Sequence, residues 1–165
     1  MSEKRIISLF ALVVVVTSVL LTSCDPSKKY AKEEQNKIQQ YLSDNSTLAF
    51  EKKASGLYFL EVQAGTGNLA VQHDTAYVKY TGKFLDGTVF DKNVGTTDTL
   101  KFPVNEGYLI NGFDEALLYM KKGSKALILV PSTLGYGPAG YYTIGGYTPL
   151  LFDIELVKLV HPASK

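Results

Sequence analysis

This sequence is poor in the residues that most often carry metal or redox chemistry, with one cysteine and two histidines among 165 residues. One cysteine excludes a disulfide within the chain, and a core of roughly 100 residues or more folds without one. His73 and His161 stand far apart in polar segments, which argues against a metal site or a proton relay. The formal net charge is only +1, and no basic cluster alternates with aromatic residues, so the sequence argues against nucleic-acid binding.

Glycine and tyrosine are plentiful, with 14 and 11 residues, and they favour turns and β-structure over a helical bundle. Alternating or continuous apolar residues predict strands over 57–62, 75–84, 99–104, 125–130 and 150–160. One helical face is predicted from Phe113, Ala116, Leu117 and Met120, and Gly123 is placed to end that helix. The connections are too short for parallel crossovers, so we expect an α+β fold with an antiparallel sheet wrapped around one short helix.

A long apolar run lies near the N-terminus, where residues 6–21 follow Lys4 and Arg5. A basic start, a short apolar segment and small residues predict a secretory signal peptide over 1–23. The Leu-Thr-Ser before Cys24 resembles the bacterial lipobox, which implies lipidation of that cysteine. We expect its acyl chains to anchor the protein to a membrane of the bacterial cell envelope, as a periplasmic or outer-membrane lipoprotein. The alternatives are an uncleaved signal-anchor helix and a buried free cysteine.

Residues 24–54 form a polar arm, which we expect to be lipid-anchored and partly helical. Its middle, 28–42, has good helix formers and neither glycine nor proline. Ile38, Tyr41 and Leu42 provide a thin apolar stripe, which is too short for a coiled coil. Two interpretations remain open: a tether that lifts a domain off the membrane, or a helix that docks a partner or a second copy.

Four separated segments carry most of the functional information. They are YTGKFLDGTVFD (80–91), GYLINGFDEALLYMKKG (107–123), LGYGPAG (134–140) and LLFDIELV (150–157). Each is weak alone, because an Asp-Gly turn is a general hairpin signal and a glycine-rich stretch is only a loop. In this order and spacing they resemble the FKBP-type peptidyl-prolyl cis-trans isomerases. The resemblance predicts such a domain over 55–160, with 161–165 as a tail.

The resemblance implies a curved antiparallel half-barrel around one helix, with an apolar pocket that holds a proline and needs no metal or cofactor. The residues it assigns to catalysis are Phe90, Asp91 and Tyr136. Those it assigns to substrate binding are Tyr80, Leu100, Phe102, Leu109, Ile110, Phe113, Ile144 and Phe152. The Tyr136 hydroxyl and the Ile110 N–H would point at substrate carbonyls, and Asp91 would lie at the pocket edge without acting as a general acid or base. Taken alone, the same apolar residues would form the core of any α+β domain.

The sequence departs from the family pattern at three places. Phe113 stands where the family usually has tryptophan, which predicts a roomier pocket. Ile144 is followed by two glycines instead of two prolines, which predicts a mobile flap or one shaped for another partner. The arginine that usually follows the Phe-Asp pair is missing from 93–100, so Asp91 lacks its customary charged partner. Together these changes predict weakened binding of macrolide inhibitors.

The sequence thus predicts a lipid-anchored peptidyl-prolyl cis-trans isomerase that acts on proline-containing segments of exported proteins. Binding of the twisted amide in a dry pocket would lower the rotation barrier, so no nucleophile is needed. Two other functions fit the same pattern. One is a catalytically weak or silent binding module of an envelope complex, and the other is a chaperone that holds unfolded chains.

Overall fold

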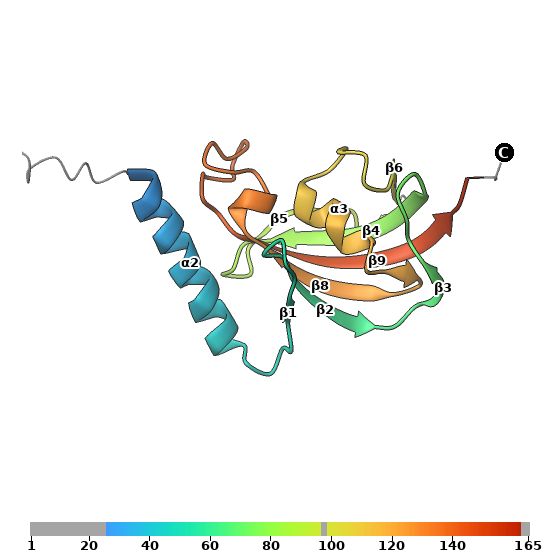
Figure 1. Ribbon diagram of the computed structural model, residues 1–165, viewed down its shortest axis with the longest axis horizontal. Helices are drawn as coiled ribbons and strands as arrows, with labels where there is room; N and C mark the ends of the chain where they lie inside the picture. The colour runs from blue at the N-terminus through green and yellow to red at the C-terminus, as the bar shows by residue number, and fades with distance from the viewer. Residues whose placement is uncertain (1–25, 97–98, 163–165) are drawn as a thin grey trace, which may run out of the picture.

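The computed structural model describes residues 26–96 and 99–162, so the predicted signal peptide and Cys24 lie outside the described residues. A curved sheet holds one short helix against its concave side, and a longer helix runs along one end of the sheet (Figure 1). The elements in chain order are α2 (Pro26–Asp44), β1 (Glu51–Lys52), β2 (Tyr58–Gln63), β3 (Thr66–Leu69), β4 (Thr75–Lys83), β5 (Val89–Lys92), β6 (Leu100–Pro103), α3 (Asn111–Leu117), β7 (Lys121–Lys122), β8 (Lys125–Val130), the 3₁₀ helix η1 (Ser132–Leu134) and β9 (Leu150–Val160).

The main sheet is antiparallel throughout, as predicted, with the strand order β1-β2-β8-β9-β4-β5. The first half of β4 also pairs with β6, and β3 and β7 form a separate two-stranded sheet. Strand β1 precedes position 55, the predicted start of the domain, yet it belongs to the sheet. The predicted strands over 57–62, 75–84, 99–104, 125–130 and 150–160 all form within two residues of their predicted ends.

The core lies between the concave face of the sheet and α3. Alternate residues of β9, from Leu150 to Leu156, are buried on this face, as the period of two in a strand requires. The predicted helix face meets them, with Phe113 buried at 3% exposure and Leu117 at 0%. The helix is shorter than predicted, because the N–H groups that follow Leu117 bond carbonyls three residues back in a tightened turn. Gly123 therefore does not end α3, and at φ 81° it turns the chain between β7 and β8 instead.

Helix α2 covers part of the opposite face of the sheet. Ile38, which is only 1% exposed, packs among Tyr58, Leu129 and Leu151. Burial of one such side chain contributes roughly 1.5–3 kcal/mol to stability. The predicted thin stripe is thus the contact surface of a helix that lies on its own domain, an arrangement that neither open interpretation of the arm contains.

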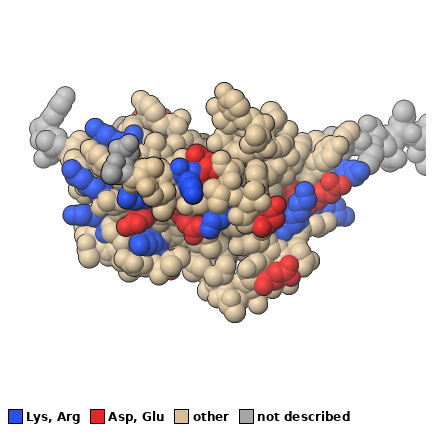
Figure 2. Space-filling model, turned by 180° about the vertical axis from the view of Figure 1, so that it is seen from behind, with Lys and Arg blue, Asp and Glu red and all other residues tan. Residues whose placement is uncertain are grey.

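The surface carries both signs of charge in a mixed pattern. Figure 2 shows lysines interspersed with aspartates and glutamates over the face seen from behind. Within residues 26–96 and 99–162, neither helix has the length and apolar character needed to cross a membrane.

Candidate active site

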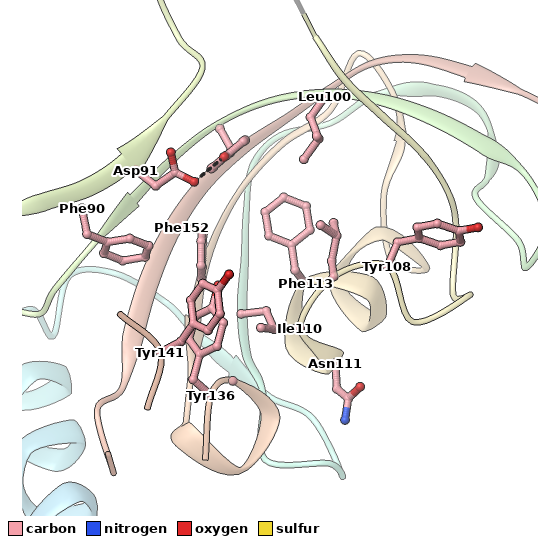
Figure 3. Close-up of a pocket in the computed structure, with 13 residues that line it drawn as sticks. Phe90, Asp91, Leu100, Tyr108, Ile110, Asn111, Phe113, Tyr136, Tyr141 and Phe152 are labelled. Atoms are coloured by element: carbon pink, nitrogen blue, oxygen red, sulfur yellow. Dashed lines mark hydrogen bonds between the residues drawn. The ribbon is translucent and has the colours of Figure 1, made fainter. Parts of the chain in front are cut away.

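A pocket of about 490 Å³ opens where α3 begins, between β5 and the loop that follows β8 (Figure 3). Its lining side chains are mostly aromatic and aliphatic, and four tyrosines, one aspartate and one asparagine add polar groups, a combination that is usual in binding sites for small molecules. The lining residues are Tyr80, Phe90, Asp91, Leu100, Tyr108, Leu109, Ile110, Asn111, Phe113, Gly135, Tyr136, Tyr141 and Phe152.

Phe113 forms the floor of the pocket, because the first turn of α3 points its ring at the sheet. The ring meets Tyr80 edge-on at 5.9 Å and Phe152 at 5.4 Å between centroids. Phe90 meets Phe152 at 5.7 Å with the planes at 90°. Edge-to-face pairs of this kind contribute about 0.5–1.5 kcal/mol each beyond their buried area. Gly82 makes room for this packing, since a Cβ there would lie 2.6 Å from the Phe90 ring.

The polar edge of the pocket is a short hydrogen bond between neighbouring strands. The Tyr80 hydroxyl on β4 donates to the Asp91 carboxylate on β5 at 2.6 Å, the dashed line of Figure 3. Burial is the main cause that raises the pKa of Tyr80 well above its usual range, and the hydrogen bond to Asp91 and the negative charge of Asp91 raise it further. The hydroxyl therefore remains a donor at neutral pH, and Tyr80 is the partner of Asp91 in a chain that lacks the usual arginine.

Asn93 holds this edge in place, and sequence reasoning missed it. Strand β4 pairs with β6 as far as Val78 and with β5 from Thr81 onward. Between them, the Tyr80 N–H donates to Asn93 Oδ1 at 2.7 Å, and Asn93 Nδ2 donates to the Val78 carbonyl at 3.0 Å. The side-chain amide thus substitutes for a strand partner. An asparagine directly after a strand was the available signal, because such side chains often bond nearby backbone.

The wall of the pocket opposite the strands is the loop 131–149, which carries Tyr136. The Tyr136 ring stacks on the Tyr141 ring, with 5.2 Å between centroids and 10° between planes. Burial is the main cause that raises the pKa of Tyr136, and electrostatic interactions with Tyr141 and Asp91 raise it further. The loop folds tightly on itself, since a Cβ at Gly146 would collide with the Pro138 carbonyl. A close backbone approach therefore requires one glycine of the Gly-Gly pair. The same fold turns Ile144 into the core, at 6% exposure.

Residues 67–157 match the family model of the FKBP-type peptidyl-prolyl cis-trans isomerases. The chain belongs to this family.

The chain is 36% identical over 137 residues to the FKBP-type peptidyl-prolyl cis-trans isomerase FkpA of Aeromonas hydrophila. That alignment covers 82% of this chain and 50% of the relative. It is 37% identical over 133 residues to the outer membrane protein MIP of Legionella longbeachae, with 79% and 56% covered. The crystal structure of FkpA from Escherichia coli aligns with a TM-score of 0.71 at 29% identity, over 97% of this chain and 74% of that one. This chain thus spans about half the length of the curated relatives it matches.

The pocket brings together all of the residues predicted for catalysis and substrate binding except Phe102 and Ile144. Phe102 lies behind the floor, 6.3 Å from the Phe113 ring, and is buried in the core. The residues that the prediction did not assign to the lining are Tyr108, Asn111, Gly135 and Tyr141. Both histidines lie outside this lining, where His73 pairs with Glu106 and His161 with Asp74.

Proposed function

We propose that this FKBP-family chain is a peptidyl-prolyl cis-trans isomerase that rotates X–Pro bonds in exported polypeptides. The observation that carries the proposal is the pocket itself. Phe113 and Phe152 form an apolar floor of edge-on rings on which a proline ring could rest, and Tyr80, Asp91 and Tyr136 bring hydroxyl and carboxylate groups to its rim.

The chemistry requires no nucleophile. Rotation of the planar amide costs about 20 kcal/mol because resonance is lost in the twisted form. Water stabilises the polar, planar ground state better than the twisted state, whose carbonyl is less polar. An apolar pocket that grips the proline ring and excludes water therefore lowers the barrier, and each ~1.36 kcal/mol removed is a tenfold gain in rate.

The polar groups at the rim would hold the substrate backbone. Tyr136, whose raised pKa keeps its hydroxyl protonated, would donate to a substrate carbonyl. Ile110 is the N-cap residue of α3, and the N–H at a helix start takes no part in the helical bonding, so it would bind a second carbonyl. Asp91, held by Tyr80, would lie beside the twisting bond as a fixed charge and not as a proton donor.

The test is a protease-free isomerisation assay with the full chain in mild detergent and peptides that contain Leu-Pro or Phe-Pro. We expect a rate clearly above the thermal rate, and at least a tenfold loss in Phe90→Ala. A thermal rate from a folded chain would refute the proposal and favour the binding module. Suppression of aggregation that persists in Phe90→Ala would favour a holdase.

We further propose that Cys24 carries a lipid anchor and that the protein works in the bacterial cell envelope. The support is the signal-like sequence and a relative that is named an outer membrane protein. Labelled fatty acid should be incorporated into the wild-type chain and not into Cys24→Ser. Label retained by that variant would refute the anchor.

Weakened macrolide binding is proposed from the smaller floor residue. Phe113 lines the pocket where the family usually has tryptophan, and a smaller ring covers less of a bound macrolide. Phe113→Trp should bind such an inhibitor more tightly than the wild type does. Equal affinity of the two chains would contradict this idea.

A further inference from the structure

Helix α2 presents almost entirely exposed polar side chains, and Glu34 is an exception. Its residue exposure is only 6%, although a carboxylate is costly to remove from water unless it is hydrogen-bonded. Both of its oxygens are used by one residue on a different part of the chain. Oε1 accepts the Ser132 N–H at 2.5 Å and Oε2 accepts the Ser132 hydroxyl at 2.6 Å, across 98 residues of sequence.

Ser132 in turn fixes the backbone on both sides of Tyr136. Its carbonyl accepts the Gly135 N–H at 2.9 Å and the Gly137 N–H at 2.8 Å. Ser132 opens η1 directly after Pro131, which has no N–H, so Glu34 binds the first donor of this short helix. The arm helix is therefore linked to Tyr136 through one serine.

A second contact from α2 reaches the same place. The Tyr30 ring stacks on Tyr147 at 5.7 Å, and the Tyr147 N–H donates to the Gly137 carbonyl at 3.0 Å. Figure 1 shows the first turns of α2 beside this loop, drawn in orange. Both contacts of the helix thus converge on the residue that follows Tyr136.

We propose that Glu34 is a positioning residue that sets the place of Tyr136 in the proline pocket through Ser132, an inference that rests on the proposed isomerase function. Charge-assisted hydrogen bonds are shorter and stronger than neutral ones, which suits a contact that must hold a surface loop. Glu34 lies outside the segment that matches the family model, 67–157. Through Ser132, the arm helix supports Tyr136 from outside that segment, although it contributes no side chain to the pocket lining.

The test compares Glu34→Ala with Glu33→Ala, a matched control that removes the exposed neighbouring carboxylate. Glu34→Ala should lower kcat/KM about tenfold, because small displacements of a positioned group are expensive in rate. Glu33→Ala should leave it within about twofold. Glu34→Gln should recover part of the loss, because its amide oxygen still accepts the Ser132 N–H.

A double-mutant cycle separates positioning from general loss of structure. If Glu34 acts through Tyr136, Glu34→Ala should have little further effect in a Tyr136→Phe background. The same loss in both backgrounds, or no loss in either, would overturn the inference. Ile38→Ala weakens the packing of α2 without touching Ser132, so it should destabilise the chain more than Glu34→Ala does while reducing the rate less.

Hydrogen exchange gives a readout that does not depend on activity. The Gly135 and Gly137 amides should exchange faster in Glu34→Ala, while the Ile128 and Ile154 amides in the sheet should not change. Unchanged exchange at both glycines would overturn the inference. If the wild-type chain proves inactive, the proposed function fails, and exchange at these two amides still decides whether Glu34 holds the loop.

Discussion

The two walls of the pocket are held in place by different means. The sheet wall comprises Tyr80, Phe90 and Asp91 and, where it meets the floor, Phe152. It is fixed by neighbours in the same sheet, where Tyr80 bonds Asp91 and Asn93 bonds the β4 backbone. The loop wall is fixed from outside, where Ser132 is bound by Glu34 of the arm helix. Tyr80, Asp91 and Asn93 lie within the segment that matches the family model, 67–157, and Glu34 lies outside it. Half of this site thus takes its support from a residue that lies outside the family-model segment.

The largest expected effect is on the sheet wall. Phe152→Ala removes a ring that contacts Tyr80, Phe90 and Phe113. The free energy of unfolding should fall by about 3–5 kcal/mol, as for other buried phenylalanines, and isomerase activity should be lost. Denaturant titration measures the first effect. Tyr142→Ala, at a side chain that is 92% exposed, is the control and should change stability by less than about 0.5 kcal/mol.

Asn93→Ala should have the next largest effect. It leaves the Tyr80 N–H and the Val78 carbonyl without their partner, at a cost of about 1–3 kcal/mol. Tyr80 and Asp91 should shift with the backbone, so kcat/KM should fall as well. Asn68→Ala, at an exposed residue of β3 outside the pocket lining, should change neither quantity. Equal losses in the two variants would show that Asn93 does not hold the sheet wall.

On the loop wall, Tyr136→Phe should lower kcat/KM about tenfold, or ~1.4 kcal/mol, with no loss of stability. The ring stack with Tyr141 is kept, and only the hydroxyl is removed. Tyr141→Phe deletes the neighbouring hydroxyl in the same way and should stay within about twofold of the wild type. If the two variants lose activity equally, the hydroxyl of Tyr136 has no special function.

The smallest effect concerns pH. The raised pKa values of Tyr80 and Tyr136 keep both hydroxyls protonated, so the rate should be flat from about pH 6 to about 9. The folded pKa of Tyr80 lies above its unfolded value near 10. Its contribution to stability is therefore complete below about pH 10 and is lost as the pH rises further. Tyr80→Phe should make the alkaline loss of stability shallower, and an unchanged pH profile of unfolding would contradict this assignment.

The sheet wall is largely predictable from sequence, because alternation in the strands fixes which side chains share a face. Leu150, Phe152 and Ile154 fall on one face by the period of two, and all three are buried on the concave side. The end of α3 is less predictable, since apolar spacing continues through Met120 while the backbone already tightens after Leu117.

The loop wall is harder to predict, for a physical reason. Spacing within 131–149 does not say which side chains face the pocket. Ile144, assigned to substrate binding, is buried against the core and is not among the lining residues. Glu34 resembles any solvated acid on a polar helix until Ser132, 98 residues away, is seen to bind it. A contact between residues so far apart in sequence depends on the tertiary fold, and the local sequence pattern does not reveal it.

The docking of α2 also sets how far the pocket could travel from an anchored Cys24. If residues 25–54 were an extended leash, they would reach up to ~100 Å. As a helix of 19 residues that begins at Pro26, most of this length becomes a rod of about 28 Å packed along the domain. An anchored molecule would then keep its pocket within a shallow layer next to the lipid surface.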